Sequence, residues 1–164
     1  MSTKILHIVR HGKALQDCYA VRDDDRPLIE KGILKSISIA KQLRAQYPAP
    51  ELIISSHATR ALHTAHIFAR TTGYPHERVQ VNEKLYLHGE NETYHILKNL
   101  PNELDSVMIV GHNPDVTFLA NQLAGCFVNP LPTSGVVTIC FETDQWSETD
   151  RVKAKCACIY NSGS

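Results

Sequence analysis

Short apolar runs alternate with segments of helical periodicity through the first two-thirds of the chain, and this alternation constrains the fold more than any other feature. A run of four to eight apolar residues is typical of a buried strand, whereas apolar residues three or four apart indicate an amphipathic helix. We predict strands over residues 4–9, 52–54, 79–81, 107–110, 136–141 and 152–160, and helices over residues 29–47, 58–72, 91–100 and 115–124. Such a pattern favours an α/β fold, a three-layer α/β/α sandwich with a mostly parallel central sheet. A polar segment joins the last two strands, so we expect them to be antiparallel and the sheet to be mixed.

Length and charge narrow the class of protein. The chain has 164 residues, with 17 Lys and Arg against 17 Asp and Glu, and 43% of its residues are apolar. This length favours one domain spanning residues 1–164. Balanced charge argues against nucleic-acid and polybasic membrane-surface proteins, which need a clustered basic excess. No transmembrane segment or secretion signal is visible, so we expect a cytoplasmic protein. Cys156 and Cys158, on one face of a strand, are expected to be buried free thiols.

Three of the predicted strands are followed by polar segments that contain arginine or histidine. The first runs into Arg10-His11-Gly12, the second into Ser55-Ser56 and then Arg60, and the third into Gly111-His112-Asn113. Ligands of doubly wound sheets bind outside the carboxyl ends of the strands. If these strands are parallel neighbours, two arginines and two histidines converge there, and the glycines let the backbone approach a ligand closely.

Two arginines and two histidines in one crevice describe an anion site. The guanidinium group matches phosphate bidentately, and a neutral imidazole near pH 7 is a nucleophile that can accept a phosphoryl group. The arginines would neutralise charge on the phosphoryl oxygens during the transfer, so the reaction would need no metal ion and no other cofactor.

Four segments resemble motifs of the histidine phosphatase superfamily, which has the phosphoglycerate-mutase-like fold. Arg10-His11-Gly12 resembles its RHG signature, and the segment 55–65 is similar to its S-x-x-x-R-A-x-x-T-A pattern. Gly111-His112-Asn113 resembles the segment of its second catalytic histidine. Arg26-Pro27-Leu28, followed by Gly32, is similar to an element of the small SixA-like branch, the phosphohistidine phosphatases. The resemblance covers roughly residues 4–140.

This resemblance implies a role for each matched residue. His11 would be the nucleophile that becomes phosphohistidine, Arg10 and Arg60 would hold the phosphoryl group, and His112 would donate to a phosphoryl oxygen. Arg26, Gly12, Asn113 and Lys13 would contact the substrate. Val81-Asn82-Glu83-Lys84 resembles the stretch that carries the general acid in mutases, so Glu83 is the candidate proton donor.

Departures from the wider family point to the substrate. Lys13-Ala14 follows Gly12 where mutases carry an acid or amide, and little chain separates Glu83 from His112 to build a lid. An open, shallow site suits a phosphoprotein better than a sugar phosphate. Imidazole, with a conjugate-acid pKa of about 6.5, leaves more readily than an alkoxide. A site with a weak general acid therefore favours phosphohistidine as the substrate. The predicted partner is therefore a protein that bears phosphohistidine.

Other interpretations remain open at this stage. Arg26 could pair with a residue of Asp23-Asp24-Asp25 on the surface, and Glu83 could be an ordinary solvated carboxylate. His63 and His66 share a helix face but lack a third metal ligand. A broad-specificity phosphomonoesterase and a non-catalytic phosphate-binding domain are the alternative functions. The sequence contains neither a Cys-x₅-Arg loop nor a P-loop.

Overall fold

The protein is described here from a computed structural model that covers residues 2–86 and 89–162. The strands are β1 (Lys4–Arg10), β2 (Leu52–Ser55), β3 (Gln80–Val81), β4 (Ser106–Gly111), β5 (Val136–Phe141) and β6 (Ala154–Ile159). The α-helices are α1 (Glu30–Gln46), α2 (Thr59–Thr72), α3 (Glu90–Lys98) and α4 (Asp115–Ala124). Short 3₁₀ turns form at η1 (Asp23–Asp25), η2 (His76–Arg78), η3 (Glu83–Leu85) and η4 (Trp146–Glu148). Every predicted strand and helix is present, with ends that differ by at most two residues.

The six strands form one mixed sheet in the order β3-β2-β4-β1-β5-β6. β1, β4, β2 and β3 run parallel, with Ile8 and Ile54 both paired to Ile109. β5 pairs antiparallel with β1 and with β6. The expected fold class and the antiparallel end of the sheet are confirmed. This order brings the carboxyl ends of β1, β4 and β2 to the same edge of the sheet.

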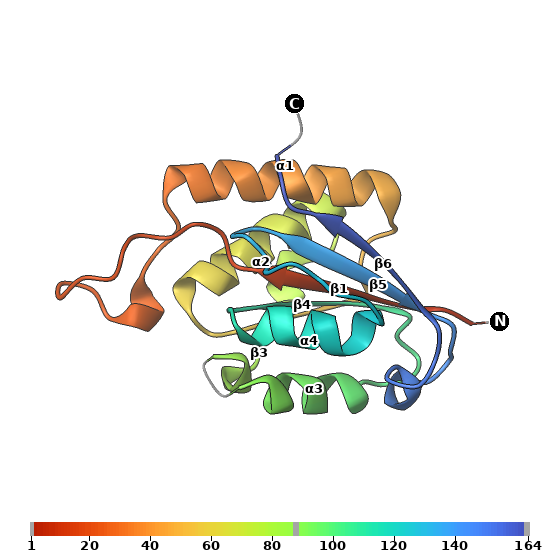
Figure 1. The fold of residues 1–164 in the computed structure, drawn as a ribbon. Coiled ribbons are helices and arrows are strands. Elements are labelled where there is room, and N and C mark those ends of the chain that lie inside the picture. The colour runs from red at the N-terminus through yellow and green to blue at the C-terminus, as the bar shows by residue number, and fades with distance from the viewer. Residues whose placement is uncertain (1, 87–88, 163–164) are drawn as a thin grey trace.

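Helices cover both faces of the sheet, which gives the three layers visible in Figure 1. Successive strand residues point to opposite faces, so Ile109 packs toward α3 and α4 while Met108 and Val110 pack toward α1 and α2. Gly73 ends α2 and Gly125 ends α4, both in the left-handed conformation that glycine adopts without strain.

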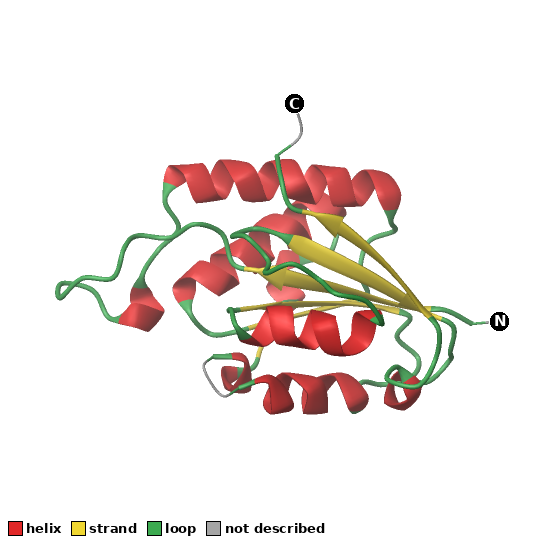
Figure 2. Cartoon of the chain, viewed as in Figure 1, coloured by secondary structure: helices red, strands yellow, loops and turns green. Residues whose placement is uncertain are grey.

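A long connection between β1 and α1 projects from the body of the molecule. Figure 2 shows it as a loop that carries η1 and turns back to α1. Two isolated bridges, Ala14 with Leu28 and Cys18 with Val21, pair its outgoing and returning halves. The loop starts at the carboxyl end of β1 and therefore leaves from the edge where the predicted site lies.

The prediction of buried thiols is wrong. Cys158 is exposed and Cys156 is half-buried, because β6 is an edge strand that only partly packs against the core. Trp146 lies in the polar connection between β5 and β6 and is fully buried. Its indole Nε1 donates to the carbonyl oxygen of Leu104 at 2.8 Å, which satisfies the buried donor.

No helix of the described ranges 2–86 and 89–162 is long and apolar enough to span a membrane.

Candidate active site

The carboxyl ends of β1, β2 and β4 meet around one open cavity of about 450 Å³. Arg10 and His11 reach it from β1, Arg60 from the start of α2, and His112 from the end of β4. Its other lining residues are Lys13, Ala14, Gln16, Asp17, Arg26, Asn113 and Thr133. The structure therefore brings together seven of the nine predicted site residues and leaves out Gly12 and Glu83.

His11 is held as a neutral imidazole with one unprotonated nitrogen, which accepts a hydrogen bond from Arg60. Its Nδ1 lies 2.8 Å from the carbonyl oxygen of Gly12, and a carbonyl only accepts, so Nδ1 carries the proton. The lone pair then lies on Nε2, which is 3.4 Å from Nε of Arg60. Burial, together with the nearby charges of Arg60 and Arg10, lowers the pKa of His11 to about 4 against the opposing effect of the Gly12 carbonyl. An unprotonated Nε2 that faces a cavity lined by cations is positioned to attack an electrophile bound there.

His112 is buried beside His11, with the two ring centroids 5.0 Å apart. Its Nε2 is 2.8 Å from Oγ of Ser56, and that oxygen already accepts from the backbone N–H of Ala58 at 3.1 Å. We assign the Ser56 hydroxyl as the donor to Nε2, and this assignment places the ring proton on Nδ1. Nδ1 is buried and has no hydrogen-bond partner among the described residues. Burial, then the neighbouring His11 and Arg60, lower the pKa of His112 to about 3, so the ring is a neutral donor.

Arg10 presents a second unpartnered donor. Its Nη1 donates to the carbonyl oxygen of Leu131 at 3.0 Å, which fixes the guanidinium plane. Its Nε is buried without a hydrogen-bond partner in the described part of the chain. A buried donor left unpaired costs about 1–3 kcal/mol, which a ligand oxygen would relieve.

Asp23, in the projecting loop, forms ion pairs with Arg60 and Arg26. Its carboxylate accepts from Nη2 of Arg60 at 3.1 Å, from Nη2 of Arg26 at 2.8 Å, and from the hydroxyl of Tyr86. The hydrogen bond from Tyr86, followed by those from Arg26 and Arg60, holds the pKa of this carboxyl well below its usual range. Sequence reasoning treated an ion pair and a cavity position as alternatives for Arg26, and the structure shows both. It named Asp23 only as a possible surface partner of Arg26 and Ser56 only as part of a strand end, and it missed Tyr86.

Comparison with known proteins identifies the family. The sequence model of the histidine phosphatase superfamily (branch 1) matches residues 6–105, more than half of the chain. The chain belongs to the histidine phosphatase superfamily. This membership supports a phosphatase activity.

Solved structures of this superfamily share the fold across nearly the whole chain. The SixA protein of Agrobacterium tumefaciens is 28% identical with a TM-score of 0.77, covering 95% of this chain and 97% of its own. The SixA protein of Nakamurella multipartitia is 22% identical with a TM-score of 0.79, covering 98% of both chains. A protein histidine phosphatase SixA complexed with tungstate is 23% identical with a TM-score of 0.78, covering 96% of both. These matches show that the chain shares its fold with SixA proteins.

Sequence relatives carry no assigned function. An uncharacterised protein of Mycobacterium tuberculosis is 28% identical over 142 residues, which are 80% of this chain and 85% of the relative. An uncharacterised chloroplastic protein of Arabidopsis thaliana is 26% identical over 151 residues, covering 87% of this chain and 69% of the relative.

Glycines of the histidine phosphatase motifs serve packing here. A Cβ on Gly12 would lie 2.9 Å from Oγ of Ser36, and one on Gly111 would lie 3.1 Å from Cγ1 of Val116. Gly12 does not line the cavity, and its N–H donates to Oγ1 of Thr64 at 2.9 Å. The expectation that these glycines open the backbone to a ligand is corrected: they let α1 and α4 approach the strand ends.

Glu83 is exposed in η3 and does not line the cavity. The turn follows β3 at the sheet edge, with β2 and β4 between it and β1. Its neighbour Tyr86 is the residue of this stretch that reaches the site, through Asp23. The structure therefore does not support Glu83 as the proton donor.

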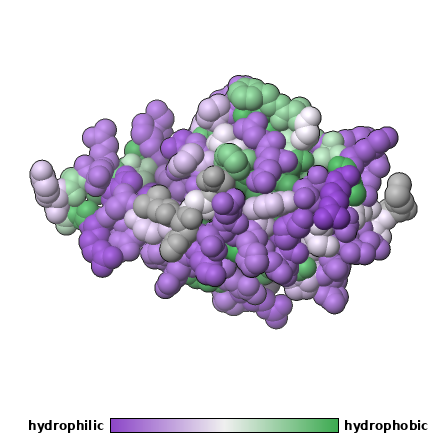
Figure 3. Space-filling model, turned by 60° about the horizontal axis from the view of Figure 1, so that its bottom comes forward, coloured by the Kyte–Doolittle hydropathy of each residue, from purple (hydrophilic) through white to green (hydrophobic). Residues whose placement is uncertain are grey.

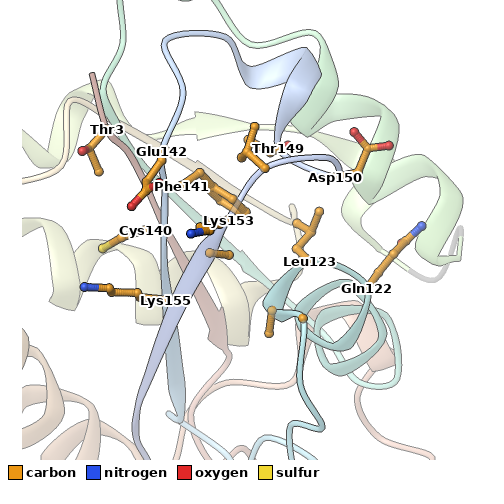
Figure 4. A pocket seen from close by; sticks show the side chains of 14 residues that line it. Thr3, Gln122, Leu123, Cys140, Phe141, Glu142, Thr149, Asp150, Lys153 and Lys155 are labelled. Carbon is orange, nitrogen blue, oxygen red and sulfur yellow. The ribbon is translucent and has the colours of Figure 1, made fainter. Parts of the chain in front are cut away.

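A larger cavity of about 590 Å³ lies at the other end of the strands, near the amino end of β1. It is lined by residues around the end of β5 and the start of β6, among them Glu142, Lys153 and Lys155 (Figure 4). Phe141 pairs with Lys4 at the beginning of β1, whereas His11 follows the end of that strand. With no histidine in its lining, this cavity lacks the nucleophile of the family.

His63 and His66 are likewise outside the site, and the described residues hold no cluster of three metal-ligating side chains.

Proposed function

We propose that this protein is a phosphatase that forms a phosphohistidine intermediate on His11 and acts on phosphohistidine in a protein. One observation carries the proposal. The unprotonated Nε2 of His11 belongs to a cavity lining that also contains two buried nitrogens without hydrogen-bond partners among the described residues, Nε of Arg10 and Nδ1 of His112. A phosphoryl group bound there would supply oxygens to both donors and a phosphorus atom to the nucleophile.

The chemistry follows from these positions. His11 Nε2 forms a bond to phosphorus while the bond to the leaving nitrogen breaks, and that nitrogen keeps the bonding pair and takes a proton from solvent water. Arg10, Arg60 and the His112 N–H stabilise charge on the phosphoryl oxygens. Water then attacks phosphorus, the P–N bond to His11 breaks, and inorganic phosphate leaves. Side chains supply the positive charge in both steps, so we propose a reaction that needs no metal ion.

The state of the carboxyl groups supports the choice of leaving group. Asp23, the carboxylate that contacts the arginines, is held ionised by its partners and so cannot donate a proton near neutral pH. Among the described residues that line the cavity, the carboxyl group is that of Asp17, which is exposed. A site without a strong general acid favours imidazole over an alkoxide as the leaving group. The open mouth of the cavity leaves room for a phosphoryl group that is carried on a protein surface.

The experiment measures phosphate release, in EDTA, from a phosphorylated histidine phosphotransfer protein and from p-nitrophenyl phosphate. We expect faster release from the protein and loss of at least 1,000-fold in His11→Ala, about the loss when a nucleophile is removed. Acid-labile, base-stable ³²P should be trapped on the wild type and not on the variant. A preference for the small ester would indicate the broad phosphomonoesterase, and saturable phosphate binding without turnover would indicate a binding domain.

A further inference from the structure

An apolar groove of about 310 Å³ adjoins the catalytic cavity. It is lined by Asn113, Pro114, Thr117, Phe118, Asn121 and Pro130. Asn113 also lines the catalytic cavity, so the two hollows share a wall. Phe118 lies one turn into α4 from Pro114, and its backbone N–H donates to the Pro114 carbonyl at 3.0 Å. The groove is therefore fixed to the same strand end that carries His112.

The polar side chains of the groove are engaged within the protein. Oγ1 of Thr117 donates to Oδ1 of Asn113 at 2.7 Å and accepts from the N–H of Leu131 at 3.0 Å. Nδ2 of Asn121 donates to the carbonyls of Thr117 and Val128, and its Oδ1 accepts from the N–H of Val128 at 2.7 Å. These bonds leave little hydrogen-bonding capacity for a ligand, and no charged residue of the described ranges lines the groove. Its chemistry suits a hydrocarbon side chain rather than a sugar, a nucleotide or a charged head group.

Phe118 remains 48% exposed despite its size. On the loop side of the cavity, Leu15 is 37% exposed and Tyr19 is fully exposed. Figure 3 shows hydrophobic atoms on the projecting loop at the left, within a face that is otherwise mostly hydrophilic. Large exposed apolar side chains thus lie on both sides of the cationic cavity. Exposed apolar surface beside a binding site is typical of a protein-interaction face.

We propose that the groove around Phe118 docks an apolar side chain of the phosphohistidine protein, located within one or two helical turns of the phosphohistidine. The inference rests on the proposed function and names how that substrate is recognised. When the phosphoryl group enters the cavity, the adjoining surface of a protein substrate must cross the wall at Asn113. Its neighbouring side chain, about 5–11 Å from the phosphohistidine on a helix, then lies over the groove. A free amino acid or a small phosphate ester does not extend that far.

The test compares two substrates that share the same P–N bond. One is a histidine phosphotransfer protein phosphorylated with phosphoramidate, and the other is free phosphohistidine. We expect Phe118→Ala to lower the ratio of kcat/KM for the protein to kcat/KM for the amino acid about tenfold, mainly through KM. A tenfold change corresponds to about 1.4 kcal/mol. Phe118→Leu, which keeps an apolar side chain, should restore most of the ratio.

Leu34→Ala is the matched control, because Leu34 is 59% exposed on α1, in the other helical layer. It should leave the ratio at the wild-type value. If the wild type prefers the phosphoprotein and Phe118→Ala keeps that preference, the docking proposal is wrong and the proposed function stands. A wild type without that preference would overturn both. A dimer that dissociates in Phe118→Ala without a change in the ratio would assign the groove to a second copy of the chain instead.

Discussion

Two imidazole protons set the reactivity of the site at the scale of single residues. Gly12 fixes the proton of His11 on Nδ1, and Ser56 allows that of His112 to lie on Nδ1. One ring therefore offers a lone pair to the cavity and the other offers an N–H. Under the proposed function, His11 would be the nucleophile and His112 the hydrogen-bond donor.

Substitution of Ser56 tests this assignment. Ser56→Ala leaves Nε2 of His112 without its partner, so the ring loses its fixed tautomer and orientation. We expect kcat to fall about tenfold with a smaller change in KM, because the lost interaction is with the phosphoryl oxygens during transfer. Ser55→Ala is the matched control: its hydroxyl is equally buried but donates to the backbone oxygen of Ser56. Equal losses in both variants would contradict a role for the Ser56–His112 contact.

At the scale of elements, the projecting loop completes a site that the sheet begins. The strand ends supply Arg10, His11 and His112, while the loop returns over the edge and places Asp23 against Arg60 and Arg26. Asp23 thus acts as a positioning residue that sets both guanidinium groups at the cavity.

Removal of the Asp23 carboxylate should weaken substrate binding. In Asp23→Ala, Arg60 and Arg26 lose a shared carboxylate and gain rotational freedom, so we expect KM to rise and kcat/KM to fall about tenfold. Steady-state kinetics on the phosphoprotein measure the effect. Asp25→Ala, in the same acidic run but exposed, should behave as the wild type. A rise in kcat/KM for Asp23→Ala would instead show that the carboxylate competes with the substrate for Arg60.

At the scale of the whole molecule, the central sheet contains a buried histidine that the chemistry does not use. His7 in β1 is fully buried, with Nδ1 2.8 Å from Oγ1 of Thr138 and the ring of Tyr47 packed edge-on against it. Burial lowers the pKa of His7 to about 4. The folded protein therefore keeps His7 neutral at pH values where the unfolded chain would protonate it.

This difference predicts loss of stability in mild acid. The folded pKa of His7 lies below the unfolded value of about 6.5, so the unfolded state binds the extra proton as the pH falls from about 6.5 to 4. We expect the free energy of unfolding to be highest above pH 6.5 and to fall through that window. His7 alone would contribute up to about 3 kcal/mol by pH 4. Urea denaturation of wild type and His7→Gln measures it, and equal slopes against pH for the two proteins would exclude His7 as a source.

The sequence by itself determined the order of strands and helices, the fold class and the four residues at the centre of the site. Apolar periodicity is a local property, and Arg10, His11, Arg60 and His112 stand directly at or near strand ends, so parallel pairing alone brings them together. Only the tertiary structure decided which side chains support them. Asp23, Tyr86 and Ser56 meet the arginines and His112 across separate segments, and no local pattern encodes such contacts. The same limit explains why the sequence suggested Glu83 as the proton donor. A matching stretch of sequence does not reveal that its turn lies at the sheet edge, where the carboxylate remains in solvent.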